Sequence, residues 1–414
     1  MNVAATFASV LPVVLFRSFP FAFSVCATRR ATLPFRVSII TTFLAAIIIE
    51  FRFGRERLYD VAWVPVVYLY FLLVACGVYW LSGAVSRRAI RAGAVLFASA
   101  LFFVVLPACV SHHASIVAML VIGWEATLSA HSYGIETHGR PRPPLLAATF
   151  FLLVNPTVVY AERGTGDRGP RADLQGICRI IVGTITMGGR SVALLLIGRT
   201  SWLRSVGVNS VSNLPTYVQF CAVSLVLALG LFCAHSGLAH IQIGWMRLLG
   251  HRLPERYVYP FMATSPADFW NRWNTWIGRW AYRYIYIPLG RRMMRALRGS
   301  LAVTWALLLS FLGVGFLHDF GVFAVRMGQS QGSVSLRFTF IFGIFGLVLV
   351  AWREGARFVR RFVDRQARWV RCVGIVLARL LLVQIAILLL WLAIPVLRSN
   401  VLPPTLERIW RWSL

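Results

Sequence analysis

Residues 264–291 read TSPADFWNRWNTWIGRWAYRYIYIPLGR, and this stretch decides how the rest of the chain is interpreted. The region around it, 241–299, is too polar to cross a bilayer and too aromatic to be an ordinary loop. Ser265 is a good helix N-cap, and Pro266 suits the first helical position. Asp268 adds a negative charge in the first turn, where the helix dipole favours it. The sequence therefore predicts a helix that begins at Pro266.

The predicted helix has an aromatic stripe and a basic face. The stripe repeats at alternating spacings of three and four residues and contains Trp270, Trp273, Ile277, Trp280 and Tyr284. The basic face contains Arg272, Arg279 and Arg283. Asn274 falls at the edge of the aromatic stripe, where its amide can face the protein interior. We expect this amphipathic helix to lie at the membrane interface, with its arginines toward water or phosphate groups.

The composition is that of an integral membrane protein. Of the 414 residues, 58% are hydrophobic and 14% are charged, whereas about a quarter of residues are charged in a soluble domain. No polar stretch is long enough to form a separate soluble domain. We therefore predict one membrane-embedded domain over residues 1–414. It divides into N-terminal helices (1–240), a cytoplasmic-side signature region (241–299) and C-terminal helices (300–414).

Apolar runs long enough, or nearly so, to span a bilayer fall at about 4–27, 37–50, 61–83, 92–110, 115–133, 145–160, 177–198, 217–240, 300–317, 336–352 and 373–397. The 145–160 run is short and contains Asn155 and Pro156. If this run is re-entrant, the arginine-rich loops sort to one side, as the positive-inside rule requires. The predicted fold class is an all-α polytopic membrane protein with about ten spans, one re-entrant segment and the amphipathic signature helix.

The charge is strongly basic, and all of the basic residues are arginine. The formal net charge is +28, from 42 basic and 14 acidic residues. These arginines are divided among short loops between apolar segments, so nucleic-acid binding is not expected. An arginine-rich surface of this kind favours anionic lipid head groups or a phosphate-bearing donor.

One histidine, His318, lies in the apolar run LLLSFLGVGFLHDFGVF. An ionisable side chain at membrane depth is by default a functional hypothesis. Its neighbour Asp319 is expected to be a helix-end or loop charge, because adjacent helical residues do not face each other. A second candidate catalytic pair is Glu125 and His131, although the two residues are separated by about 120° on a helical wheel.

The chain resembles the membrane-bound O-acyltransferase family over the segment from Gly244 to Gly290. The matching positions are Arg247, Leu248, Gly250, Leu253, Pro254, Pro260, Ser265, Asp268, Phe269, Trp270, Arg272, Trp273, Trp280, Tyr284, Tyr286, Pro288, Leu289 and Gly290. The family's second hallmark is a histidine some tens of residues downstream in an apolar helix, and His318 matches it.

The resemblance implies a fold and an activity. Members move an acyl group from a thioester, such as acyl-CoA, to a hydroxyl, so we expect an acyl thioester as co-substrate and no bound cofactor or metal. His318 would be the general base, and Asn274 would orient the thioester or donate to the oxyanion. The residues expected to bind substrate or donor are Trp270, Arg272, Trp273, Arg279 and Arg283.

The sequence is compatible with more than one hydroxyl acceptor. The polysaccharide-acetylating branch of the family has histidine where this chain has Asn274, and residues 151–164 lack the Pro-x-x-x-x-Gly-Pro pattern of that branch. The favoured expectation is acetyl transfer to a cell-envelope glycan in the bacterial cytoplasmic membrane, with an envelope-modification partner protein. A wax-ester-like reaction on a lipid alcohol is the alternative. A non-enzymatic transporter or flippase is the alternative from another class.

Overall fold

The structure is a computed structural model, and it describes residues 72–85, 93, 113–141, 144–153, 157–159, 170–199, 214–297, 299–328, 336–363, 373–374 and 377. These residues form helices and connecting loops, with no strand among them. The contacts divide the chain into two compact units. The first unit is Met1–Ser191, Cys233–Glu255 and Ala324–Gly332, and the second is Val192–Phe232, Arg256–Phe323 and Ser333–Leu414.

The first unit contains a small apolar core built from three helices. These are Leu72–Ala84, α6 (His113–Glu136) and the short α7 (Leu145–Leu153). Small side chains such as Ala75, Ala130 and Ala148 pack there with Tyr133 and Phe151. The small residues let the helices approach closely, and the aromatic rings fill the remaining space.

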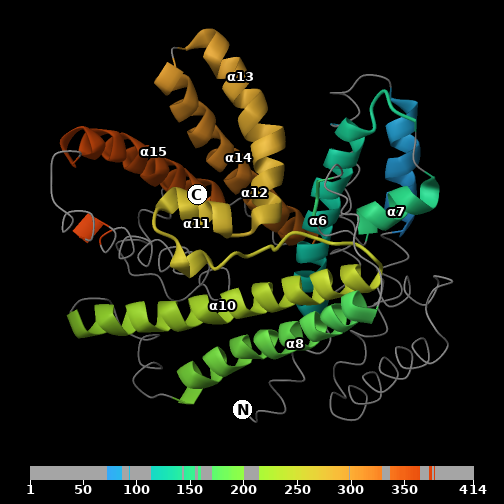
Figure 1. Cartoon of the computed structure of the whole chain (residues 1–414), viewed down its shortest axis with the longest axis horizontal. Helices are drawn as coiled ribbons and strands as arrows, with labels where there is room; N and C mark the ends of the chain where they lie inside the picture. Colours follow the sequence, from blue (N-terminus) through green and yellow to red (C-terminus); the bar gives the residue numbers. More distant parts are fainter. Residues whose placement is uncertain are drawn as a thin grey trace. The chain divides into compact units, whose positions relative to one another are not determined.

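The first unit also contains the contact between α8 (Pro170–Arg199) and α10 (Leu214–Leu248), which run antiparallel (Figure 1). Glycines on both helices meet at the contact. A Cβ added to Gly183 would lie 2.5 Å from the carbonyl oxygen of Gly237, and one added to Gly176 would lie 2.9 Å from that of Gly244. The two backbones therefore approach more closely than any side chain at these positions would allow.

The second unit contains the signature region as a chain of short elements. In order these are η3 (Pro260–Met262), α11 (Pro266–Arg272), α12 (Thr275–Ala281), the π-helical turn η4 (Tyr282–Tyr286) and α13 (Ile287–Ala296). The arginines of α13, Arg291, Arg292 and Arg295, are exposed. They form a basic surface on α13, beyond the predicted aromatic stripe.

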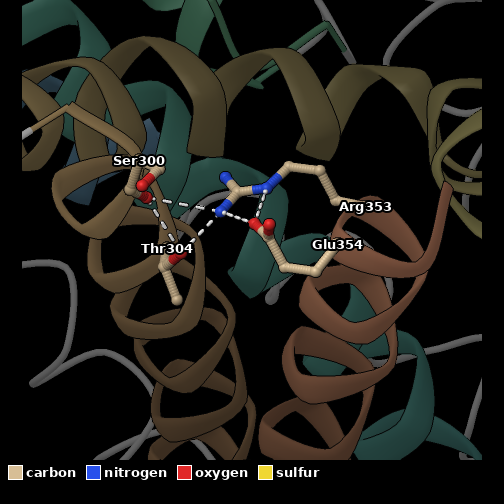
Figure 2. Close-up of polar contacts among 4 residues, drawn as sticks. All are labelled: Ser300, Thr304, Arg353 and Glu354. Atoms are coloured by element: carbon tan, nitrogen blue, oxygen red, sulfur yellow. Dashed lines mark hydrogen bonds and ion pairs between the residues drawn. The ribbon is translucent and has the colours of Figure 1, made fainter. Parts of the chain in front are cut away.

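The second unit is completed by two long helices, α14 (Gly299–Gly328) and α15 (Arg337–Val363), which pack antiparallel. At one end of the pair, Arg353 of α15 reaches the first turns of α14 (Figure 2). Its Nη2 donates to Thr304 Oγ1 at 2.5 Å and to the Ser300 carbonyl at 3.3 Å, and it also pairs with Glu354. This contact joins the beginning of α14 to the C-terminal half of α15.

Two helices in the described part of the chain are long and apolar enough to cross a membrane, Gly299–Phe320 and Phe338–Gly355. They coincide with the predicted spans 300–317 and 336–352. α7, in the predicted re-entrant run, has nine residues, about 13 Å of helix, which is too short to cross a bilayer. The predicted spans at 4–27 and 37–50 lie outside the described residues, as do 92–110 except for residue 93 and nearly all of 373–397.

Candidate functional site

Helix α11 begins where the sequence predicts. Ser265 is extended, and its Oγ accepts from the backbone N–H of Asp268 at 3.1 Å. Asp268 in turn accepts from the N–H of Thr264 at 3.0 Å and from Arg272 Nε at 2.8 Å. The hydrogen bond from Arg272 lowers the pKa of the Asp268 carboxyl below its ordinary value of 3.8, and the Thr264 N–H acts in the same direction. The N-cap at Ser265 is therefore confirmed.

The prediction of one continuous aromatic helix is wrong, because α11 ends at Arg272. Trp273 is extended, and Asn274 is left-handed with φ 42° and ψ 58°. Segment 256–258 passes beside this break and pairs with it. The N–H of Val258 donates to the Arg272 carbonyl at 3.0 Å, and the N–H of Thr275 donates to the Arg256 carbonyl at 2.8 Å. Asparagine is among the few residues that adopt the left-handed conformation readily, so the break falls there.

The break also separates the predicted arginine face. Arg272 belongs to α11, where it binds Asp268 and reaches the Val258 carbonyl at 3.4 Å. Arg279 lies in α12 and Arg283 in η4, and both are exposed. Because Arg272 lies before the break, it does not share a helical face with Arg279 and Arg283. Arg272 stabilises the local turn, whereas Arg279 and Arg283 lie on the surface.

Asn274 is held by a buried arginine that the sequence analysis did not single out. Nε of Arg256 donates to Oδ1 of Asn274 at 3.0 Å. Arg256 is 5% exposed, and its guanidinium lies over the rings of Trp276 at 5.2 Å and Tyr257 at 5.9 Å. An arginine between Pro254 and Pro260 follows no helical or strand period. No signal in the sequence therefore pointed to its burial.

Trp270 and Trp273 pack in different directions. Trp273 stacks on Phe269 with ring centroids 5.4 Å apart and meets Tyr257 edge-on at 5.3 Å, within the signature region itself. Trp270 instead contacts α14 and α15, with centroids 5.4 Å from Phe311 and 5.1 Å from Phe345. Of the two predicted binding tryptophans, Trp270 is thus the one that connects the signature region to the long helices.

His318 lies in α14 and is held by α14 and α15. Its Nδ1 is 2.7 Å from the carbonyl oxygen of Val314. Because a carbonyl oxygen only accepts, Nδ1 carries the proton in this bond, and Nε2 is the unprotonated nitrogen of the neutral ring. The imidazole stacks on Phe342 at 5.0 Å and lies 5.5 Å from Phe338. The structure thus presents the tautomer in which Nε2 can accept a proton.

Trp270 and His318 meet the same aromatic side chain. Phe342 of α15 lies 5.8 Å from the Trp270 ring and 5.0 Å from the His318 ring, centroid to centroid. Residues far apart in sequence are therefore brought to one aromatic cluster in the second unit. Asn274 lies four residues after Trp270, just beyond the C-terminal end of α11.

Asp319 is not at a helix end or in a loop, so that expectation is wrong. It lies inside α14, 4% exposed, and caps the beginning of α15. Its carboxylate accepts from the N–H groups of Phe338 and Thr339 at 2.8 and 2.7 Å, and from Thr339 Oγ1 at 2.7 Å. A negative charge at a helix N-terminus satisfies donors that have no partner within the helix. Asp319 therefore fixes α15 beside His318.

The second candidate pair lies in the first unit. Glu125 of α6 is buried and accepts a hydrogen bond from Gln242 of α10 at 3.3 Å. Gln242 thus gives the Glu125 carboxylate a polar partner on a neighbouring helix. His131 lies six residues further along α6. Among the described residues, no group of three or more His, Cys, Asp or Glu side chains could hold a metal ion.

Comparison with known proteins identifies the class. The model of the membrane-bound O-acyltransferase family matches residues 149–394, more than half of the chain. The chain therefore belongs to this family, as the signature residues and His318 predict. This membership also makes the chain a membrane protein.

Individual relatives cover smaller segments. The chain is 29% identical over 139 residues to the peptidoglycan O-acetyltransferase of Helicobacter pylori, covering 34% of this chain and 25% of that protein. It is 28% identical over 158 residues to a probable long-chain-alcohol O-fatty-acyltransferase of Arabidopsis thaliana, covering 38% and 45%. It is 28% identical over 118 residues to a probable alginate O-acetylase of Pseudomonas fluorescens, covering 28% and 23%. The matched segments thus span less than half the length of these relatives.

Proposed function

We propose that this protein is an acyltransferase that moves an acyl group, with acetyl favoured, from a thioester to a hydroxyl of a cell-envelope glycan. The observation that carries the proposal is the state of His318. Its Nδ1–H is engaged by the Val314 carbonyl, so Nε2 is the basic nitrogen of a ring stacked on Phe342. A neutral imidazole in an apolar helix suits the removal of a proton from a hydroxyl.

One base is enough for the proposed reaction, because His318 both removes the hydroxyl proton and returns a proton to the leaving thiolate. Nε2 of His318 takes the proton of the acceptor hydroxyl as its oxygen attacks the thioester carbonyl. The tetrahedral intermediate then collapses, the C–S bond breaks, and the imidazolium returns its proton to the thiolate. Asn274 would donate to the negatively charged oxygen of that intermediate, a contact typically worth about 10²–10³ in turnover. The exposed Arg279 and Arg283 would bind phosphates of an acyl-CoA donor.

The acceptor assignment depends on the relatives. Two of the three relatives described above are named for acetyl transfer to peptidoglycan or alginate, which supports a glycan acceptor. With such an acceptor, we propose that the protein acts in the bacterial cytoplasmic membrane together with an envelope-modification partner protein. The second candidate is a long-chain alcohol. It is favoured by the plant relative, 45% of whose length matches this chain, and by Asn274, since the glycan-acetylating branch has histidine there.

The test uses purified wild type in detergent with radiolabelled acetyl-CoA and, separately, labelled palmitoyl-CoA, with bacterial membrane extract as a mixed acceptor pool. The proposal expects consumption of acetyl-CoA and alkali-labile label in the glycan fraction. Label from palmitoyl-CoA in a neutral lipid fraction would replace the glycan proposal with the alcohol proposal. An amide-linked product, stable to mild alkali, would contradict O-acyl transfer altogether.

A further inference from the structure

The hydrogen bond between Arg256 and Asn274 determines which way the asparagine amide faces. A guanidinium carries only donors, so the Asn274 atom that meets Arg256 Nε at 3.0 Å must be the oxygen. The amide nitrogen then occupies the opposite position. The donor chemistry of arginine therefore determines the orientation of the Asn274 amide.

Arg256 also fixes the backbone of Asn274. The Arg256 carbonyl accepts from the N–H of Thr275, and the neighbouring Val258 N–H donates to the Arg272 carbonyl. These two bonds bracket Asn274, which has the left-handed φ of 42°. Both the main chain and the side chain of Arg256 therefore hold Asn274 in place.

Arg256 is itself held firmly. Its side chain is 5% exposed and lies over Trp276, which is 1% exposed. Burial of a guanidinium costs free energy unless its surroundings compensate, and the aromatic faces of Trp276 and Tyr257 contribute a cation–π interaction. The hydrogen bond from Arg256 Nε to the Asn274 oxygen adds to this stabilisation.

The amide nitrogen of Asn274 donates to none of the described residues, and the side chain is only half-buried. We infer that Arg256 is a positioning residue, which turns the Asn274 amide so that its N–H groups serve as donors in acyl transfer. This inference rests on the function proposed above, because it specifies how Asn274 acts within it. Asn274 is thereby a donor to the developing oxyanion and not an acceptor for the hydroxyl proton.

The test is a double-mutant cycle with Arg256→Met and Asn274→Ala, since methionine preserves the apolar contact with Trp276. We expect Arg256→Met to lower kcat by about 10- to 100-fold, because misplacement of a catalytic group by about 1 Å has an effect of that size. KM for the thioester should change little. We expect Asn274→Ala to lower kcat by about 10²–10³, and the double variant to be no slower than Asn274→Ala alone. Arg256→Lys, which keeps a charged donor, should recover part of the loss.

Equal fold losses for Arg256→Met in the wild-type and Asn274→Ala backgrounds would overturn the inference, because Arg256 would then act independently of Asn274. The same four proteins are also unfolded in sodium dodecyl sulfate. A non-additive unfolding midpoint is expected if the pair exists in the folded protein, and additive midpoints would contradict the pairing. If the wild type shows no thioester turnover, the proposed function fails, while the unfolding cycle still decides whether Arg256 holds Asn274.

Discussion

The helix pairs α8–α10 and α14–α15 are both antiparallel and both approach closely at glycines, but their polar contacts differ. α8 and α10 meet through glycines, with the backbone of Gly183 against that of Gly237. One of their polar contacts is formed by Arg179 of α8, which donates to His240 at 2.7 Å and pairs with Glu255 beyond the end of α10. α14 and α15 also approach closely at a glycine, since a Cβ added to Gly315 would lie 2.6 Å from the Phe338 carbonyl oxygen. Their polar contacts are formed by the Asp319 carboxylate on the first turn of α15 and by Arg353 on the first turns of α14.

Two adjacent ionisable side chains of α14 have different surroundings. Both carboxylate oxygens of Asp319 are used by the first turn of α15, which is a structural task. The Val314 carbonyl and the rings of Phe338 and Phe342 orient the imidazole of His318. The adjacent residues His318 and Asp319 therefore separate into a proposed base and a residue that fixes the helix next to it.

The largest expected effect is the loss of His318. We expect His318→Ala to lower kcat by about 10³, within the range for removal of a general base, measured as thioester consumption by the detergent-purified protein. The matched control is His138→Ala, at the half-buried turn that follows α6, which should retain turnover. An equal loss in both variants would show that histidine truncation merely damages the protein.

The close contact of α8 and α10 predicts the next largest effect. Gly183→Ala places a Cβ 2.5 Å from the Gly237 carbonyl, and such overpacking should lower the free energy of unfolding by about 3 kcal/mol. The control is Gly313→Ala in α14, where the nearest atoms belong to Ile285 at 3.9 Å. Since alanine is the better helix former, this variant should gain up to about 1 kcal/mol. Equal changes in titrations with sodium dodecyl sulfate would refute the backbone contact.

The cap at the start of α15 can be tested separately. Asp319→Asn keeps the shape of the side chain but replaces one acceptor by an N–H₂ group facing the donors of α15. We expect a loss of about 2 kcal/mol in the free energy of unfolding. Thr339→Val removes only the hydroxyl contact and should cost about 1 kcal/mol. If Asp319→Asn unfolds at the wild-type midpoint, Asp319 does not cap α15.

The smallest effect is expected at the opposite end of the pair. Arg353→Met removes the bonds to Thr304 and Ser300, and we expect a loss of about 1 kcal/mol from partly exposed hydrogen bonds. Glu354→Gln changes a largely exposed partner, and exposed ion pairs contribute about 0–1 kcal/mol, so it should be nearly neutral. A larger loss for Glu354→Gln than for Arg353→Met would show that the ion pair, and not the contact with α14, stabilises this end.

Local signals were predictable from the sequence, and contacts between distant segments were not. The cap at Ser265 depends on residues three positions apart, and it was found. The break at Asn274 depends on hydrogen bonds from segment 256–258, so the regular spacing of Trp270 to Tyr284 misleadingly predicted one helix. The cap by Asp319 depends on the register of α14 against α15, and no feature near Asp319 in the sequence reports that register.

In the candidate site, too, residues with a local sequence signal were predictable, and residues that depend on distant contacts were not. His318 stood out because an ionisable residue in an apolar run is costly, and Asn274 stood out because of the family signature. Arg256 was missed because its partner lies across a loop and its burial depends on Trp276. Phe342, which contacts both Trp270 and His318, is one of many phenylalanines in apolar runs. Only the packing distinguishes it from the others.

Chemical rescue of His318→Ala is the most direct test of the proposed base. Truncation leaves a space beside Phe342 that matches an imidazole ring, and added imidazole can accept the hydroxyl proton there. Thioester turnover by His318→Ala should rise with imidazole concentration, while that of wild type and His138→Ala should not. Turnover of His318→Ala at the wild-type rate without imidazole would contradict the central role of His318.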